Sequence, residues 1–123
     1  LELSEGMVRY NCKKENKMSV TFYDPENPTE YDEEYNIVGG GPEANFSNSN
    51  AQMIVDVLGL ESEPSVYGKT SAENMLVAIA RANVALKVLC RDDGLRDYLL
   101  RSFESLKEVA ECSLKHGKMI HWG

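Results

Sequence analysis

The C-terminal third of the chain combines a long apolar stripe at helical spacing with an apolar strand pattern that follows it directly. The stripe starts after Asp92 or Asp93, whose carboxylates suit a helix N-terminus, and Gly117 is expected to close the helix. Its apolar members are Leu95, Leu99, Phe103, Leu106, Ala110 and Leu114. Residues 119–122 form the strand pattern. Because this order suits helices layered on a sheet, the sequence predicts an α+β fold with three helices packed on one face of a small β-sheet.

A first helix is predicted over residues 50–58. Ser49 and Gln52 have the spacing of a capping box, in which each side chain bonds the backbone N–H of the other residue. Gly59 can adopt the left-handed conformation that ends a helix. The apolar face consists of Ala51, Met53, Ile54, Val57 and Leu58. These features predict a short amphipathic helix with defined ends.

A second helix is predicted to begin at Thr70 or Ser71 and to run to about Leu89. Thr70 and Glu73 have the spacing of another capping box. The apolar face consists of Met75, Leu76, Ile79, Ala82, Leu86 and Leu89. We expect this face to pack into the core.

Two strands are predicted before the first helix. Residues 19–23 are rich in β-branched and aromatic side chains, and Asp24-Pro25 ends the segment. Residues 35–38 form a second, shorter strand candidate. The glycines of residues 39–41 are interpreted as a flexible break.

The length of 123 residues predicts one α+β domain over residues 18–123, preceded by a leader over residues 1–17. Met7 and Met18 are both candidate native starts, and residues 13–17 back-translate to a purine-rich run compatible with a bacterial ribosome-binding site. No apolar run approaches the roughly 20 residues of a membrane span, and the first residues lack a secretory signal pattern. The three cysteines are widely spaced and odd in number. The sequence therefore predicts a cytoplasmic protein with reduced thiols.

Charge is divided unevenly along this chain, whose net charge is −7. Residues 18–68 hold ten acidic residues and no Lys or Arg, whereas residues 69–123 hold nine basic and seven acidic residues. The negative excess argues against nucleic-acid binding, which relies on Lys and Arg contacts to phosphates. The plain interpretation is a solvated acidic face. The functional interpretation is a surface that attracts a basic partner or the basic part of a second copy.

The leading functional prediction is an interaction or adaptor module with an acidic binding face. The predicted partner-contact residues are Glu30, Asp32, Glu33, Glu34 and Tyr35. The expected partner is a protein, either another protein or a second copy in a homodimer, and neither a nucleic acid nor a membrane. Such a complex should be sensitive to salt.

The first alternative is the binding of a small ligand or anion at the N-terminus of the first helix. The candidate residues are Asn45, Ser47, Asn48 and Ser49. Free backbone N–H groups and the positive end of the helix dipole can hold an anion there. The competing interpretation is local capping and turn formation, for which Ser and Asn are well suited.

A less favoured alternative is an enzyme that depends on Cys112, His116 or His121. Cys112 and His116 are four residues apart on a helix, and with His121 they could ligate zinc or form a nucleophile pair. Cys112 and His116 also have structural explanations, as an apolar filler and as a helix C-terminal cation respectively. Residues 68–70 read Gly-Lys-Thr but lack the earlier glycine of a phosphate-binding loop. The prediction leans against an enzyme, with no catalytic residue, no cofactor and no metal.

Four short motifs also occur in a fixed order along the chain. They are Phe22-Tyr23-Asp24-Pro25, Asn45-x-Ser47-Asn48-x-Asn50-Ala51, Leu58-Gly59-Leu60 and Ile120-His121-Trp122-Gly123. This combination resembles a group of small uncharacterised bacterial proteins over about residues 18–123. The resemblance implies no catalytic or binding residue. The leader and the lack of a strong enzyme motif also resemble reading frames carried by mobile gene cassettes of the integron type.

Overall fold

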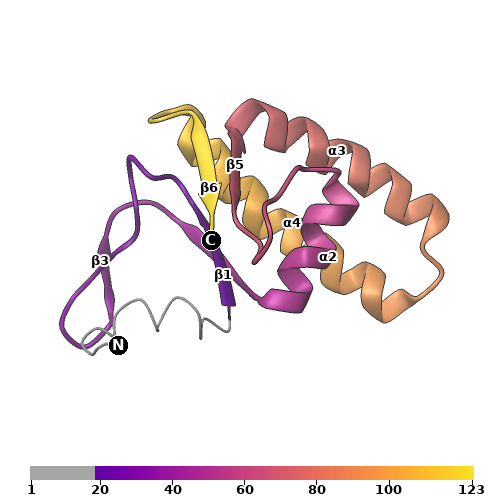
Figure 1. Ribbon diagram of the computed structural model, residues 1–123, viewed down its shortest axis with the longest axis horizontal. Coiled ribbons are helices and arrows are strands. Elements are labelled where there is room, and N and C mark those ends of the chain that lie inside the picture. The colour runs from indigo at the N-terminus through magenta and orange to yellow at the C-terminus, as the bar shows by residue number, and fades with distance from the viewer. Residues whose placement is uncertain (1–18) are drawn as a thin grey trace.

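The computed structural model describes residues 19–123, and the leader predicted over residues 1–17 lies outside this part of the chain. The described part contains three helices, a four-stranded antiparallel sheet and a two-stranded one (Figure 1). The helices are α2 (Asn48–Leu58), α3 (Ala72–Leu89) and α4 (Asp93–Leu114). The main sheet contains β1 (Ser19–Tyr23), β4 (Glu43–Ser47), β5 (Gly68–Ser71) and β6 (Met119–Trp122), and the small sheet contains β2 (Glu30–Tyr31) and β3 (Ile37–Gly39). The predicted α+β fold with three helices is confirmed.

The main sheet has the strand order β4-β1-β6-β5, so the first and last described strands lie side by side at its centre. Side chains alternate between its two faces. In β1, Val20 and Phe22 are buried, whereas Thr21 and Tyr23 are only half-buried. In β6, Ile120 and Trp122 are buried in the same way. The helices pack on this inner face. Within residues 19–123, the side chains of the opposite face, called the outer face below, are half-buried or exposed.

The core lies between the inner face and the three helices. Phe22 stacks on Trp122 with ring centroids 5.3 Å apart and meets Phe46 edge-on at 5.8 Å. The largest fully buried side chains include Phe22, Phe103, Ile54, Met75, Leu99, Leu106 and Ile120. Each such side chain contributes about 1.5–3 kcal/mol of burial free energy. The exposed members of the predicted apolar faces are Val57, Leu89, Leu95 and Leu114.

The start of α2 differs from the prediction. Ser47, not Ser49, is the N-cap, and its Oγ accepts a hydrogen bond from the backbone N–H of Asn50 at 3.3 Å. The predicted capping box of Ser49 and Gln52 is therefore wrong, because the extended backbone of β4 continues to Ser47 and places Ser49 inside the first turn. The predicted stop is confirmed, since Gly59 is left-handed with φ 72°.

The start of α3 shows the same shift. Ser71 caps the helix and accepts from the backbone N–H of Asn74 at 3.0 Å, so the predicted pairing of Thr70 with Glu73 is wrong. Thr70 lies in β5, and its hydroxyl accepts a hydrogen bond from the Asn74 side chain instead. At the starts of both α2 and α3, a polar strand is therefore followed directly by the helix.

At α4 the predicted start is confirmed and the predicted end is not. Asp92 caps the helix and accepts from the backbone N–H of Leu95 at 3.0 Å. The helix ends at Leu114, and the left-handed residue after it is Lys118 with φ 65°, not Gly117. Gly117 is needed for a close approach, because an added Cβ would lie 2.8 Å from Cγ of Glu26. None of the helices within residues 19–123 has both the length and the apolarity of a membrane span.

The glycines of residues 39–41 form a packed joint, whereas a flexible break was expected. Gly40 has φ 80°, and a Cβ there would lie 2.0 Å from the carbonyl oxygen of Pro28. The backbone N–H of Gly41 donates to the carbonyl of Asn27 at 3.0 Å. The two segments that connect the main sheet to the small sheet, residues 24–29 and 40–42, are therefore in close contact.

Candidate functional site

The hairpin of β2 and β3 projects from the main sheet, on the side away from the helices (Figure 1). We call residues 30–39 the arm. Every residue from 30 to 38 is exposed, and the main packing of β2 and β3 is against each other. The arm brings together all five predicted partner-contact residues, which are Glu30, Asp32, Glu33, Glu34 and Tyr35.

Asp32 organises the turn at the end of the arm. Its Oδ1 accepts from the backbone N–H of Asn36 at 2.9 Å and from that of Glu34 at 2.8 Å. The bond from Asn36 is the largest cause that lowers the pKa of Asp32, and the bond from Glu34 acts in the same direction. The turn is therefore held in a defined conformation by an ionised carboxylate.

Tyr35 occupies the position in this turn that glycine or asparagine usually fills. Its φ is 65°, and its side chain is 85% exposed. A left-handed non-glycine residue costs about 1–2 kcal/mol. The aromatic ring of Tyr35 is therefore exposed to solvent at the tip of the arm, on a strained backbone. Strained backbone conformations of this kind are concentrated at functional sites.

The arm is both acidic and apolar. Its sequence contains four carboxylates and no basic residue, and the ion pair found within residues 19–123 joins Arg96 and Asp93 in α4 instead. Ile37 is 69% exposed, and Val38 beside it is also exposed. The separation of charge along the chain therefore persists in space at the arm. An exposed apolar patch with a charged rim usually marks a surface that binds another molecule.

A second exposed apolar surface lies on α3. Val77, Arg81, Val84 and Val88 recur at spacings of four, three and four residues, so they share one side of the helix, and all four are exposed. We call them the α3 outer face. The helix thus has an apolar stripe on its solvent side as well as on its core side. Residues 74–91 contain three basic residues and no acidic residue.

The outer face of the main sheet carries a polar row that crosses all four strands. Cross-strand pairing aligns Glu43 with Tyr23, Tyr23 with His121 and His121 with Lys69. The rings of Tyr23 and His121 meet edge-on with centroids 6.2 Å apart. Tyr23, His121 and Lys69 also line a pocket of about 640 Å³, called the edge pocket below, at the β5 side of the sheet. The members of this site are far apart in the chain, so no sequence motif indicates it.

The predicted ligand residues at the start of α2 have mostly structural partners. The amide of Asn45 donates to Thr21 Oγ1 at 2.8 Å and to Ser19 Oγ at 3.2 Å, which ties β4 to β1. Ser47 caps α2, and Asn48 and Ser49 are exposed in its first turn. Ligand binding by Asn45, Ser47, Asn48 and Ser49 stays a prediction.

The three residues of the predicted enzyme alternative lie on different surfaces. His121 points to the outer face, where it meets Tyr23, whereas Cys112 lies in α4 on the other side of the sheet and accepts a long hydrogen bond from Asn27. His116 is exposed beyond the end of α4. No group of three or more His, Cys, Asp or Glu side chains suited to a metal ion is found within residues 19–123.

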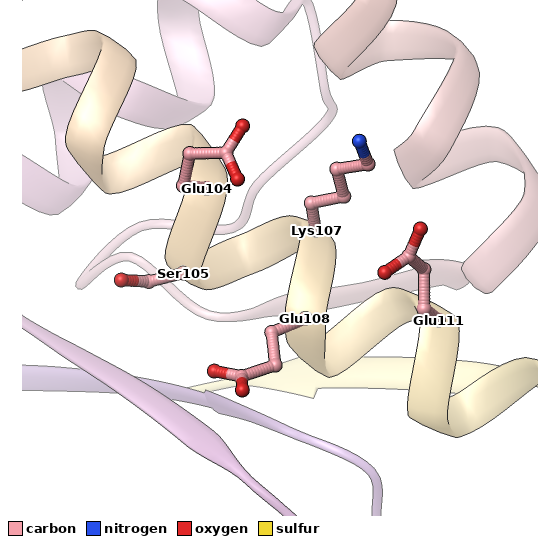
Figure 2. A pocket seen from close by; sticks show the side chains of 5 residues that line it. All are labelled: Glu104, Ser105, Lys107, Glu108 and Glu111. Carbon is pink, nitrogen blue, oxygen red and sulfur yellow. The ribbon is translucent and has the colours of Figure 1, made fainter.

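A further hollow of about 390 Å³ lies on the solvent side of α4 (Figure 2). Its lining comes from this one helix, and the side chains fan outward from it. The lining residues are Glu104, Ser105, Lys107, Glu108 and Glu111. Exposed helix side chains with no second wall do not enclose a ligand, so this surface serves below as a control region.

Comparison of the chain with protein-family models, curated proteins and solved structures finds no match. The resemblance to small bacterial proteins stays a prediction.

Proposed function

We propose that this protein is an interaction module that forms a homodimer, in which the arm of each copy binds the α3 outer face of the other. The observation that carries the proposal is complementarity. One exposed surface is apolar and acidic, the other is apolar and basic, and both belong to the same chain. Opposite charges favour this pairing and guide the encounter, while the apolar side chains supply the burial energy.

The α3 outer face supports the proposal because a helix with apolar residues on both sides is normally covered on both sides. Direct packing of α3 on the α3 of a second copy is disfavoured. It would bring Arg81 and its basic neighbours in residues 74–91 against an identical basic surface with no acidic residue to offset them. The arm removes this repulsion, since Glu30, Glu33 and Glu34 carry the opposite charge.

The placement of the two surfaces supports a closed dimer. The arm and α3 lie toward opposite ends of the long axis of the molecule (Figure 1). If two copies align side by side in opposite directions, a two-fold axis generates both arm-to-α3 contacts at once. Such an isologous arrangement closes, whereas a single contact of this kind would continue into a filament.

Sedimentation equilibrium of the purified protein tests the proposal. We expect a dimer whose dissociation constant rises steeply between about 50 mM and about 500 mM NaCl, because the Debye length shortens from about 14 Å to about 4 Å. The double variant Glu33→Lys/Glu34→Lys should dissociate the dimer, since neither side chain has a structural hydrogen bond in the described residues. A matched control, Glu104→Lys/Glu108→Lys, changes the same charge on α4 and should leave the dimer intact.

A wild-type protein that stays monomeric at low salt contradicts the proposal. In that case, an immobilised arm that captures a basic protein would assign the arm to a different partner. A dimer that resists both salt and the Glu33→Lys/Glu34→Lys change would show that another surface mediates association.

A further inference from the structure

We propose that the edge pocket binds a small zwitterion of amino-acid size, with its carboxylate held by Lys69 and His121 and its ammonium group held by Glu61 and Glu63. The proposal concerns a site separate from the arm and the α3 outer face. It rests on the charges in the pocket, on the rigidity of its wall and on its volume.

The floor of the pocket is part of the main sheet. Lys69 and His121 are direct cross-strand partners, and so are His121 and Tyr23. Side chains in such pairs have Cβ atoms about 4.5–5.5 Å apart, so the three polar ends form a continuous surface. Lys69 is exposed and forms no ion pair with any residue of the described chain. Its ammonium group is therefore available to a ligand.

The wall of the pocket is the loop that leads into β5, and it is firmly held. The indole N–H of Trp122 donates to Ser62 Oγ at 3.1 Å, and that hydroxyl donates to the carbonyl oxygen of Tyr67 at 3.2 Å. The backbone N–H of Glu63 donates to the same carbonyl at 2.7 Å. A wall that is ordered before the ligand arrives lowers the entropy cost of binding.

The same loop stores backbone strain. Ser65 and Val66 are consecutive left-handed residues, with φ of 71° and 56°. A β-branched residue in this region is a true outlier, and each such residue costs about 1–3 kcal/mol. Val66 is buried, so core packing holds the strained turn in place. This turn connects Glu63 and Tyr67, which both line the pocket.

The ligand class follows from the charges. Glu61 and Glu63 line the pocket together with Lys69, yet none of these side chains pairs with another. Unpaired groups of both signs in one pocket complement a molecule that carries both signs. Two carboxylates in the lining disfavour a polyanion such as a nucleoside triphosphate. The rings of Tyr23 and Tyr67 offer apolar faces to a side chain, and about 640 Å³ accommodates an amino acid or a dipeptide.

The chain contains a single tryptophan, Trp122, which lines the pocket and also packs in the core, so its fluorescence provides a first signal of binding at this site. We would titrate the protein with the twenty common L-amino acids and confirm each response by calorimetry. L-Phenylalanine would be compared with phenethylamine, which lacks the carboxylate, and with N-acetyl-L-phenylalanine, which lacks the ammonium charge. We expect saturable binding of at least one amino acid. If L-phenylalanine binds, phenethylamine and N-acetyl-L-phenylalanine should each bind at least about 10-fold more weakly.

Two exposed positions test the assignment without disturbing the core. Lys69→Met and Glu63→Gln should each weaken binding at least about 10-fold, because each removes one of the two groups that hold a ligand charge, whereas Glu104→Gln on α4 should have no effect. No response to any amino acid at millimolar concentration would overturn the proposal. Equal binding of the zwitterion and both singly charged analogues, or unchanged binding by Lys69→Met, would overturn it as well.

Discussion

The phenol of Tyr31 donates a hydrogen bond to the carboxylate of Glu43, and this bond ties the arm to the edge strand of the main sheet. Glu43 is also the cross-strand partner of Tyr23, which lies on the floor of the edge pocket. The arm and the polar row on the outer face are therefore connected through one carboxylate. Because the bond is exposed, it acts by positioning the arm, with little effect on the stability of the core.

The Tyr31→Phe variant should loosen the arm without unfolding the domain. The change removes the phenol that anchors β2 and leaves the ring in place. We expect faster amide exchange in residues 32–39 and an unchanged thermal midpoint, measured by hydrogen–deuterium exchange and calorimetry. Tyr67→Phe changes the same group in a tyrosine outside the arm and serves as the control. Equal exchange in the Tyr31→Phe and wild-type arms would rule out an anchoring role for this bond.

The same contact predicts a loss of arm order in alkali. The hydrogen bond to Glu43 raises the pKa of Tyr31 above 10.0, with burial and the negative charge of Glu43 acting in the same direction. A raised pKa means that the contribution is fully present below pH 10 and is lost as the pH rises through the pKa of the folded state. Ultraviolet titration of the phenols should show a difference between wild type and Tyr31→Phe that titrates above pH 10.

Acid should open the turn at the tip of the arm. Backbone hydrogen bonds, that of Asn36 first, lower the pKa of Asp32 below its ordinary value of 3.8. The contribution of a depressed carboxyl group is present above its unfolded pKa and is lost as the pH falls through the folded pKa. The amide resonances of Glu34 and Asn36 should therefore shift below about pH 4. Asp32→Ala should show the shifted resonances at neutral pH, and Glu33→Ala should not.

Replacement of Tyr35 separates the effect of its strained backbone on stability from the effect of its ring on dimer affinity. Tyr35→Gly relieves the left-handed conformation, so the stability of the arm should be maintained or should rise by up to about 1 kcal/mol. Dimer affinity should nevertheless fall about 10-fold or more, because tyrosine is enriched among the residues that dominate binding energy and the proposed dimer buries this ring. Tyr35→Phe keeps the ring and should retain most of the affinity. An undiminished affinity in Tyr35→Gly would mean that the ring makes no contact with the second copy.

Gly68 connects the core to the edge pocket. A Cβ at this position would lie 2.7 Å from Cζ2 of Trp122, so Gly68→Ala should displace the indole and cost about 1–3 kcal/mol of unfolding free energy. Tryptophan emission should shift in the same variant. Gly94→Ala is a suitable control, because its nearest neighbour would be Asp92 Oδ1 at 3.6 Å, an ordinary contact. Equal stability of the two variants would contradict the close packing of Gly68 on Trp122.

The elements that sequence analysis predicted are those with strong side-chain periodicity. The stripes of α3 and α4 repeat over several turns, β1 alternates polar and apolar residues, and β6 is a short apolar run, so the pattern indicates most of their buried positions. The predicted strand over residues 35–38 is displaced to β3, because residues 33–35 are used by the turn.

The polar strands β4 and β5 were not predicted, because pairing with a neighbour makes them strands. Asn45 points to the open face of the sheet and bonds to β1, whereas Lys69 is aligned by its pairing with β6. Their Ser and Thr residues indicated helix starts in the sequence, and the structure places those starts one or two residues away. Tertiary pairing overrides local propensity in such segments.

The candidate surfaces differ in how far the sequence reveals them. The arm residues are consecutive, so their charge was visible at once. The α3 outer face was missed, although Val77, Val84 and Val88 recur opposite the buried stripe and provide the signal for it. The edge pocket joins Tyr23, Lys69 and His121 from three strands, and only the strand order brings them together.

Reciprocal charge reversal tests the central claim most directly. Glu33→Lys/Glu34→Lys reverses the arm, and Arg81→Glu/Lys87→Glu reverses the basic surface of α3. Each double variant alone should sediment as a monomer. In an equimolar mixture, one contact pairs the two reversed surfaces and the other pairs two unchanged surfaces, so a heterodimer should form with an affinity near that of the wild type. A mixture that stays monomeric, or either double variant that still dimerises alone, would contradict the account.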